Sequence, residues 1–247
     1  MNKLSIMAKS VMIAMALIET IYANNDSSNY SLLKNWTGLY AGVNEGFVFS
    51  NVQLKSQQLG FTNPSETCNT SSDFSTYSPG IQLGYIYQLP NYLVSGIEAN
   101  ATFNTNQQVT LGCNCPNNLN VSDRFSFRNK MQSSIKGRVG SAVNWNKSLL
   151  LPYLTAGVSF ANVRLAYTNE GGDYYSKNTN QAGSLIGAGI EWAFMQNWSL
   201  RAEYSYVNYG NAIKMKIPSI YGLVDPNGYA RLDLNANNVL LAINYWI

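Results

Sequence analysis

Apolar and polar residues alternate with a period of two through much of the second half of the chain. The clearest stretch is residues 198–206. Its two faces are Trp198, Leu200, Ala202, Tyr204 and Tyr206 on one side, and Ser199, Arg201, Glu203 and Ser205 on the other. Strict alternation over this length predicts a β-strand with two chemically different sides. The polar side carries an arginine and a glutamate. The pattern therefore favours an apolar face turned to lipid and a charged face turned inward, as in a transmembrane β-barrel.

The alternation predicts eight strands along the whole chain. They cover residues 36–50, 79–89, 93–103, 127–144, 149–163, 183–194, 198–209 and 237–247. Short links at 90–92, 145–148 and 195–197 alternate with long links at 51–78, 104–126, 164–182 and 210–236. Short turns at one end and long loops at the other are typical of bacterial outer-membrane barrels, and an even number of antiparallel strands lets the sheet close. The predicted fold is all-β: an eight-stranded antiparallel up-and-down transmembrane β-barrel with four long extracellular loops and three short periplasmic turns.

The N-terminal segment has the pattern of a secretory signal peptide. Lys3 and Lys9 precede a short apolar stretch at 11–18, and Ala23 offers a cleavage site. The alternative is an N-terminal helix of the mature fold. The predicted organisation is a signal peptide over residues 1–23 and an outer-membrane barrel domain over residues 24–247.

Composition argues against several other classes of protein. The chain has no run of about 18 apolar residues, which excludes a standard membrane-spanning helix. Its formal net charge of only +3 indicates no nucleic-acid partner. The chain has no histidine, so the usual general base and the Ser-His-Asp arrangement are missing. We therefore predict no catalytic residue, no metal site, no cofactor and no enzyme activity.

Six charged residues fall on the inward face of the predicted strands. They are Glu98, Lys136, Arg138, Glu191, Arg201 and Glu203. The interior of an eight-stranded barrel is just wide enough for side chains to fill, so these three acids and three bases must pair with one another or with trapped water. We expect a polar plug that closes the barrel. The alternative is an ion pathway or proton relay, which would make the protein a narrow pore.

Aromatic residues on the outward face are candidates for the membrane–water interfaces. They are Trp192, Trp198, Tyr204 and Tyr206. In the last predicted strand, Ile243, Tyr245 and Ile247 share one face with Leu241.

The three cysteines, Cys68, Cys113 and Cys115, all lie in segments predicted as long loops. A secretory signal implies an oxidising compartment, where one disulfide from Cys68 to Cys113 or Cys115 would tie two loops together. Free or intermolecular thiols are the alternative.

Several segments in order resemble the small porin-like, opacity-type (OmpA-like) outer-membrane β-barrel proteins. This family includes surface antigens and hemin-binding proteins of Gram-negative bacteria. The similar segments are 36–44, 80–85, 96–99, 137–140, 152–158, 187–192 and 197–204. Each is weak alone, but together they span nearly the whole mature chain.

The resemblance implies a location in the cell outer membrane and a role in surface display, adhesion or antigenicity without catalysis. Implied partners are outer-membrane lipid and lipopolysaccharide, a host or envelope partner at the loops, and the assembly machinery, which recognises a C-terminal aromatic. This chain departs from that signal because it ends in Ile247, although Tyr245 fits it. The alternatives are hemin or a small apolar ligand held by the loops, a narrow pore, or a soluble secreted barrel with an apolar interior.

Overall fold

The chain forms β-strands throughout the part that the structure describes. The computed structural model describes residues 35–58, 66–105, 108–113, 123–145, 148–168, 174–216 and 229–247. The strands are β1 (Gly38–Gln58), β2 (Glu66–Tyr77), β3 (Gly80–Gln88), β4 (Leu93–Phe103), β5 (Gln108–Cys113), β6 (Asp123–Ser141), β7 (Val143–Trp145), β8 (Ser148–Thr168), β9 (Tyr174–Ala193), β10 (Trp198–Lys216) and β11 (Tyr229–Trp246). Within these ranges, no helix is long and apolar enough to cross a membrane.

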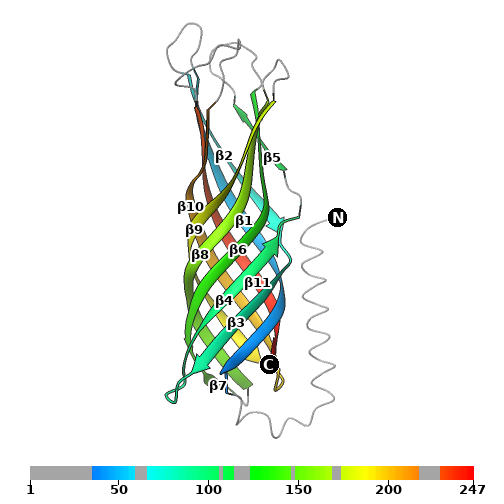
Figure 1. Cartoon of the computed structure of the whole chain (residues 1–247), viewed down its shortest axis with the longest axis vertical. Coiled ribbons are helices and arrows are strands. Elements are labelled where there is room, and N and C mark those ends of the chain that lie inside the picture. Colours follow the sequence, from blue (N-terminus) through cyan, green and yellow to red (C-terminus); the bar gives the residue numbers. More distant parts are fainter. Residues whose placement is uncertain are drawn as a thin grey trace.

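Eight of these strands close into a ring, which forms the tall barrel in Figure 1. The hydrogen-bonded order is β1, β3, β4, β6, β8, β9, β10 and β11, and β11 pairs back onto β1. Every pairing is antiparallel. The other three strands lengthen members of the ring, because β2 precedes β3, β5 follows β4 and β7 follows β6 with few residues between them. The predicted closed eight-stranded antiparallel barrel is confirmed.

The strands are longer than the alternation predicted. β1 continues to Gln58 instead of ending at residue 50, β10 continues to Lys216, and β11 begins at Tyr229 instead of residue 237. Much of each segment predicted as a long loop is therefore strand, and the remaining connections at 59–65, 114–122, 169–173 and 217–228 lie outside the described residues. Because most outward residues of these extensions are polar or charged, as with Gln53, Lys55 and Arg231, the segments resembled polar loops in the sequence.

The three predicted short turns join strands at the opposite end. The backbone N–H of Tyr92 donates to the Leu89 carbonyl at 3.1 Å, and Tyr92 has a φ of 64°, in the left-handed region. Met195 and Trp198 exchange two backbone hydrogen bonds of 3.4 Å. At the third turn, Trp145 pairs with Ser148 across two residues outside the described part. Each link is therefore a tight hairpin.

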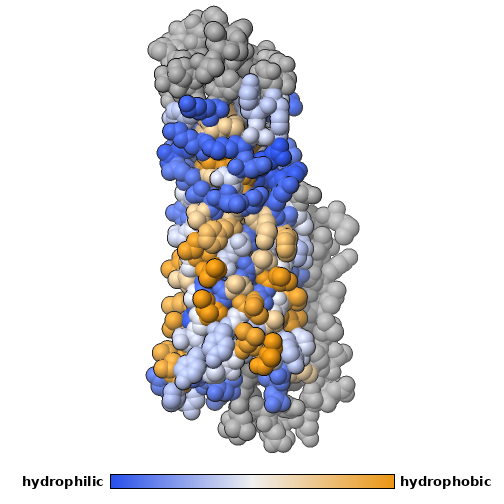
Figure 2. Space-filling model, viewed as in Figure 1, coloured by the Kyte–Doolittle hydropathy of each residue, from blue (hydrophilic) through white to orange (hydrophobic). Residues whose placement is uncertain are grey.

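The lower half of the barrel, away from β2 and β5, carries an apolar outer surface that we call the apolar belt. Figure 2 shows it as an orange zone below a blue one. Its exposed members include Leu39, Val43, Ile81, Leu83, Ile97, Ile135, Val139, Leu154, Val158, Phe160, Ile186 and Ile190. Leu154 is 68% exposed and Ile186 is 64% exposed. Such side chains would be costly in water but are compatible with the hydrocarbon of a bilayer.

In the upper half the alternation is inverted, so that apolar residues point inward and polar residues outward. We call the buried set the upper core. It includes Val48, Val52, Leu54, Leu111, Phe125, Phe127, Val163, Leu165, Tyr167, Leu185, Val207, Ile213, Leu232 and Leu234. The rings of Phe125 and Tyr167 lie 5.0 Å apart and those of Phe74 and Phe127 lie 5.8 Å apart. Above the apolar belt the barrel is therefore stabilised as a water-soluble barrel is, by apolar burial inside it.

The wall is irregular where these two zones meet. Ser78 and Pro79 separate β2 from β3, and Pro79 has no N–H to contribute to the ladder. Ser78 instead exchanges two backbone hydrogen bonds with Gly46, at 2.8 and 3.1 Å. In β6 the register against β8 shifts between Asn129 and Met131, which makes Lys130 the extra residue of a bulge. Bulges and breaks of this kind bend strands, and here they mark the transition between the zones.

We predict that truncating the upper core destabilises the whole barrel. Leu232 is fully buried, so Leu232→Ala should lower the free energy of unfolding by about 2–5 kcal/mol, because it removes apolar contacts and leaves a cavity. The neighbouring outward substitution Lys55→Ala should change it by less than about 0.5 kcal/mol. Urea unfolding in lipid vesicles, followed by gel migration without boiling, measures both. Equal effects of the two substitutions would contradict an apolar upper core.

Candidate functional site: the charged lumen

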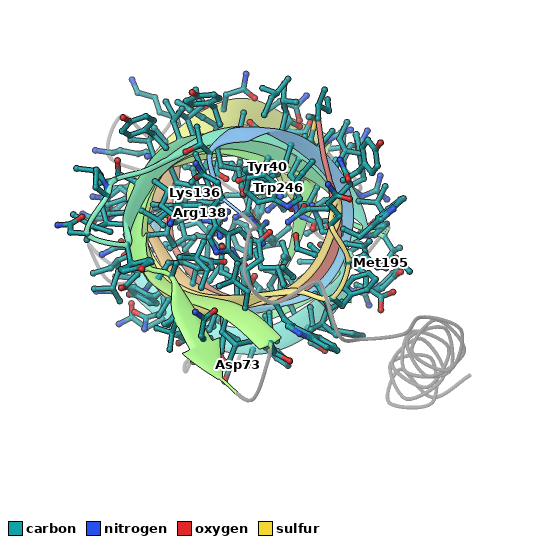
Figure 3. The ribbon with its side chains drawn as sticks, turned by 90° about the horizontal axis from the view of Figure 1, so that it is seen from below. Tyr40, Asp73, Lys136, Arg138, Met195 and Trp246 are labelled. Carbon is teal, nitrogen blue, oxygen red and sulfur yellow. The ribbon has the colours of Figure 1, made fainter. Side chains whose placement is uncertain are left out.

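The six charged residues predicted on the inward face all lie inside the barrel, at most 5% exposed. They come from β4, β6, β9 and β10. The pleat places them there, because their neighbours in sequence point to the apolar belt. In the view along the axis in Figure 3, Tyr40, Lys136, Arg138 and Trp246 point into the barrel. We call the six charged side chains the lumen network.

Glu98 is the centre of the lumen network. Arg201 donates to both of its carboxylate oxygens, through Nη1 to Oε2 and through Nη2 to Oε1 at 3.1 Å. Lys136 Nζ lies 3.2 Å from Oε1, and Arg138 Nη1 lies 3.5 Å from Oε2. The Tyr40 hydroxyl also donates to Oε2, at 2.5 Å. One buried carboxylate is thus held by all three cations of the lumen.

The other two carboxylates complete the pairing. Glu203 binds Lys136 and accepts a 2.7 Å hydrogen bond from the Tyr153 hydroxyl. Glu191 accepts from Arg138 Nη2 at 2.7 Å, from the Ser199 hydroxyl at 2.6 Å and from Asn244 Nδ2 at 2.8 Å. With three acids and three bases, the network is neutral, and each carboxylate has several donors. This is the condition under which buried charges are tolerated.

Two tyrosines, which the sequence argument did not single out, lie within the network. The Arg138 guanidinium stacks on the Tyr153 ring at 3.8 Å and lies 5.8 Å from the Tyr40 ring. Each ring covers a glycine on the neighbouring strand, because a Cβ built on Gly84 would lie 2.4 Å from Tyr40, and one built on Gly189 would lie 2.4 Å from the Tyr153 hydroxyl. The alternation of β1 placed Tyr40 inward, but only the pairing register shows that it faces a glycine.

Neutral polar side chains extend the lumen network toward β1 and β3. Gln82 Oε1 accepts from Arg201 Nη2 at 2.5 Å and from Asn44 Nδ2 at 3.0 Å. Gln82 Nε2 in turn donates to Asn244 Oδ1 at 2.5 Å. These amides come from strands that carry no charge of the network, so their contribution becomes visible only when the ring is closed.

An aromatic cluster closes the lumen below the network. Its buried members are Trp36, Tyr40, Ile86, Val94, Leu151, Tyr153 and Trp246. The Trp246 ring lies 5.4 Å from Trp36 and 4.9 Å from Tyr40, and its indole N–H donates to Ser199 at 2.9 Å. The cluster and the upper core therefore enclose the lumen network from both ends.

A small cavity of about 30 Å³ lies between the lumen network and the upper core. Lys136, Glu203, Asn100 and Asn238 are among its lining residues. In the described part of the chain, Asn100 Nδ2 and Asn238 Oδ1 are buried without a hydrogen-bond partner. A space of this size holds roughly two water molecules, which would satisfy such groups. The cavity is too small for an organic ligand.

The predicted interface aromatics lie on the outer surface. Trp198, Tyr204 and Tyr206 are 42, 51 and 36% exposed, and Trp192 is half-buried. Trp198 lies beside the short turn at 195–197, with its ring 5.0 Å from Tyr245. At the other edge of the apolar belt, the Tyr204 hydroxyl donates to Asn237 at 2.7 Å. Their assignment to the two membrane interfaces stays a prediction.

The other predicted sites are described only in part. Tyr245 and Ile247 point outward, 45 and 75% exposed, and Ile243 is half-buried. The backbone of Cys68 lies in β2, opposite Ser56, and that of Cys113 ends β5, opposite Asp123. Both cysteines were predicted in loops, and their assignment to strands corrects that prediction. Cys115, Ala23 and residues 1–34 lie outside the described residues. Among the residues described, no group of three or more His, Cys, Asp or Glu side chains could hold a metal ion.

The fold and the lumen together define an integral outer-membrane β-barrel protein. The apolar belt suits contact with lipid, and the closed ring leaves no unpaired strand edge within that belt. The chain belongs to the outer membrane protein beta-barrel domain family, whose match covers residues 25–245. Its location in the outer membrane follows from that membership, which agrees with the resemblance seen in the sequence.

Sequence relatives of this chain come from Brucella species, and a solved structure with a similar fold comes from Pseudomonas aeruginosa. The 31 kDa outer-membrane immunogenic protein of Brucella melitensis is 26% identical over 85% of this chain and 83% of its own length. The 25 kDa outer-membrane immunogenic protein of Brucella ovis is 26% identical over 72% of each chain. The crystal structure of the outer membrane protein OprG from Pseudomonas aeruginosa superposes with a TM-score of 0.52 at 12% identity, covering 85% of this chain and 96% of that one. That likeness shows the fold.

We predict that Glu98 and Arg201 are strongly coupled. Arg201→Met or Glu98→Gln alone leaves an uncompensated charge in the lumen and should cost about 3–5 kcal/mol of stability. The double variant restores neutrality, so its cost should fall short of the summed single costs by at least about 1 kcal/mol. Unfolding free energies of the four proteins in lipid vesicles give the coupling. Additive costs would mean that the two side chains do not interact as the structure has them.

Proposed function

We propose that this protein is a closed, non-conducting barrel that displays its upper hairpins on the cell surface, with a structural or surface-interaction role and no catalysis. The observation that supports the proposal most is the filling of the lumen at three successive levels. The aromatic cluster, the lumen network and the upper core follow one another along the axis. Each level holds buried side chains that contact one another in the described part of the chain, and this packing supports a lumen closed to ions.

The proposal assigns the upper half of the barrel to the cell exterior. Support comes from the asymmetry of the links, because tight turns lie at one end and longer connections at the other. The polar outer face of the upper half suits a barrel that projects beyond the bilayer. The Brucella relatives are named as outer-membrane immunogenic proteins. A surface antigen role for this chain agrees with that name, and an adhesin role stays a prediction.

The sequence also allowed a narrow pore or proton relay, a ligand held by the loops, and a host or envelope partner. The packed lumen network disfavours a narrow pore or proton relay. Hemin or another apolar ligand, and a host or envelope partner, would meet the connections between the upper hairpins, which lie outside the described residues. These two roles stay predictions. Recognition of Ile243, Tyr245 and Ile247 by the assembly machinery also stays a prediction.

We predict that the wild-type protein shows no unitary conductance in planar bilayers. The matched control is the double variant Glu98→Ala/Arg201→Ala, which removes an acid and a base together and shortens two buried side chains of the lumen network. This variant should show measurable conductance if it inserts as a folded barrel with a complete ring of strands, which gel migration with and without boiling reports. Stepwise conductance of the wild-type protein at neutral pH would show that the lumen is a pore.

We predict opposite accessibility of the two ends in whole cells. An epitope inserted between residues 221 and 222, in the connection from β10 to β11, should bind antibody on intact cells. The same epitope inserted after Asn91, in the turn between β3 and β4, should bind antibody only after the outer membrane is permeabilised. The reverse pattern would mean that the barrel is inserted in the opposite orientation.

A further inference from the structure

Four cations form a strip on the outer wall directly above the apolar belt. Arg124, Arg128 and Lys130 lie on β6, and Arg164 lies on β8, the neighbouring strand of the ring. All four side chains are exposed or half-buried. Arg128 and Arg164 point outward, since their neighbours Phe127 and Leu165 point inward as members of the upper core. We call this set the basic strip.

Arg128 and Arg164 lie directly opposite each other across the β6–β8 ladder. Like charges in directly opposed positions destabilise an antiparallel pair. Among the side chains that the structure describes, no acidic one forms an ion pair with any of the four cations. Arg128 and Arg164 therefore repel each other in the sheet. An anion bound between them would replace this repulsion with attraction to both.

The position of Arg164 is fixed by neutral partners. One of its guanidinium nitrogens, Nη2, donates to the Tyr174 hydroxyl at 2.9 Å and to the Ser176 hydroxyl at 3.3 Å, both on β9. Hydroxyl groups orient the side chain without neutralising it. Its remaining N–H groups are therefore left to meet an anion, for which the planar guanidinium is well suited when the anion is a phosphate.

The other cationic row of the upper half differs in this respect. Lys55, Arg231 and Lys214 also lie opposite one another, on β1, β11 and β10. There, Arg231 lies 3.5 Å from Asp233, and Lys214 lies over the Tyr229 ring at 5.3 Å. Two of its three cations thus have partners within the protein, and the row lies farther along the strands from the apolar belt. It serves as a natural control for the basic strip.

Three cations of the basic strip, Arg128, Lys130 and Arg164, lie near the height of the headgroup region of a bilayer, and Arg124 lies farther out along β6. The last belt residues below the basic strip are Met131 on β6 and Phe160 on β8, which are 39 and 43% exposed. Arg164 lies four residues beyond Phe160, which is about 13 Å along a strand and roughly 10 Å along the axis of a tilted barrel. Headgroups occupy about the first 5–8 Å beyond the hydrocarbon, so the backbone of Arg164 lies just above that layer, and its long side chain can reach down into it.

We propose that the basic strip and the apolar belt beneath it form a binding site for an acylated, phosphorylated sugar, the lipid anchor of lipopolysaccharide. The phosphates would be held by Arg128, Arg164 and Lys130, and the acyl chains would pack on Met131, Phe160 and their neighbours. Charge complementarity and the position at the bilayer surface support this occupant over a protein partner. The site deepens the proposed function and rests on its orientation, because this glycolipid forms the outer leaflet.

The test compares two double variants that remove the same charge. Arg128→Gln/Arg164→Gln removes the opposed arginines of the basic strip, and Lys55→Gln/Lys214→Gln removes two cations of the control row. Both are folded in neutral detergent, checked by gel migration without boiling, and titrated with bisphosphorylated lipid A under native mass spectrometry. The strip variant should bind roughly tenfold more weakly than wild type, since charge-assisted bonds to phosphate are lost. The control variant should bind as wild type does.

Further probes decide the identity of the ligand. Monophosphorylated lipid A should bind more weakly than the bisphosphorylated form, and Arg128→Lys/Arg164→Lys should restore part of the affinity. Equal losses in the two glutamine variants, or no loss in either, would overturn the site. Equally tight, strip-dependent binding of phosphatidylglycerol would assign it to anionic lipids in general, and competition by millimolar inorganic phosphate would assign it to soluble anions. Either result would overturn the glycolipid assignment.

These measurements separate the binding site from the proposed function. The strip lies on the outer wall, so neither glutamine variant should alter the absence of conductance. Loss of lipid binding with an unchanged closed lumen would concern the site alone. If the epitope experiment showed the opposite orientation, the proposed function would fail even though the purified protein bound lipid A in detergent.

Discussion

The structure depends on the neutralisation of Glu98 inside a closed sheet. Its carboxylate is shared by Arg201, Lys136 and Arg138, which come from two strands on different sides of the ring. An unpaired charge in so narrow a lumen would be very unfavourable, so the strands must reach this register before the network is satisfied. The network therefore links closure of the barrel to one pairing register, in which Glu98 faces Lys136 directly across the β4–β6 ladder.

One continuous sheet faces two solvents, lipid around the lower half of the barrel and water around the upper half. Where the wall faces lipid, the apolar side of each strand points outward and polar side chains fill the lumen. Where it faces water, the same strands turn apolar residues inward, as with Val52, Leu54 and Leu232. The pleat does not change between the zones; only the kind of residue on each face does. The register shift at Lys130 and the break at Pro79 lie near this transition.

The low sequence identity to the relatives agrees with the few requirements that a barrel wall places on its sequence. Relatives at 26% identity align over most of both chains, and a structure at 12% identity shares the fold. A barrel wall requires alternation, glycines where rings lie against the neighbouring strand, and a neutral lumen, and many sequences meet these requirements. The polar outer residues above the apolar belt are not subject to these requirements. They can therefore differ from one protein to another, and the basic strip is such a feature.

The sequence by itself determined the number of strands in the ring, the inward side of each strand and the six charges of the lumen network. It could do so because side chains two residues apart in a strand share a face. It did not determine how far β1, β10 and β11 extend, since their polar outer residues resemble those of loops. The partners of each charge, the glycines beneath Tyr40 and Tyr153, and the opposition of Arg128 to Arg164 were decided by the tertiary structure. These contacts join strands distant in sequence, and their register is set only when the ring closes.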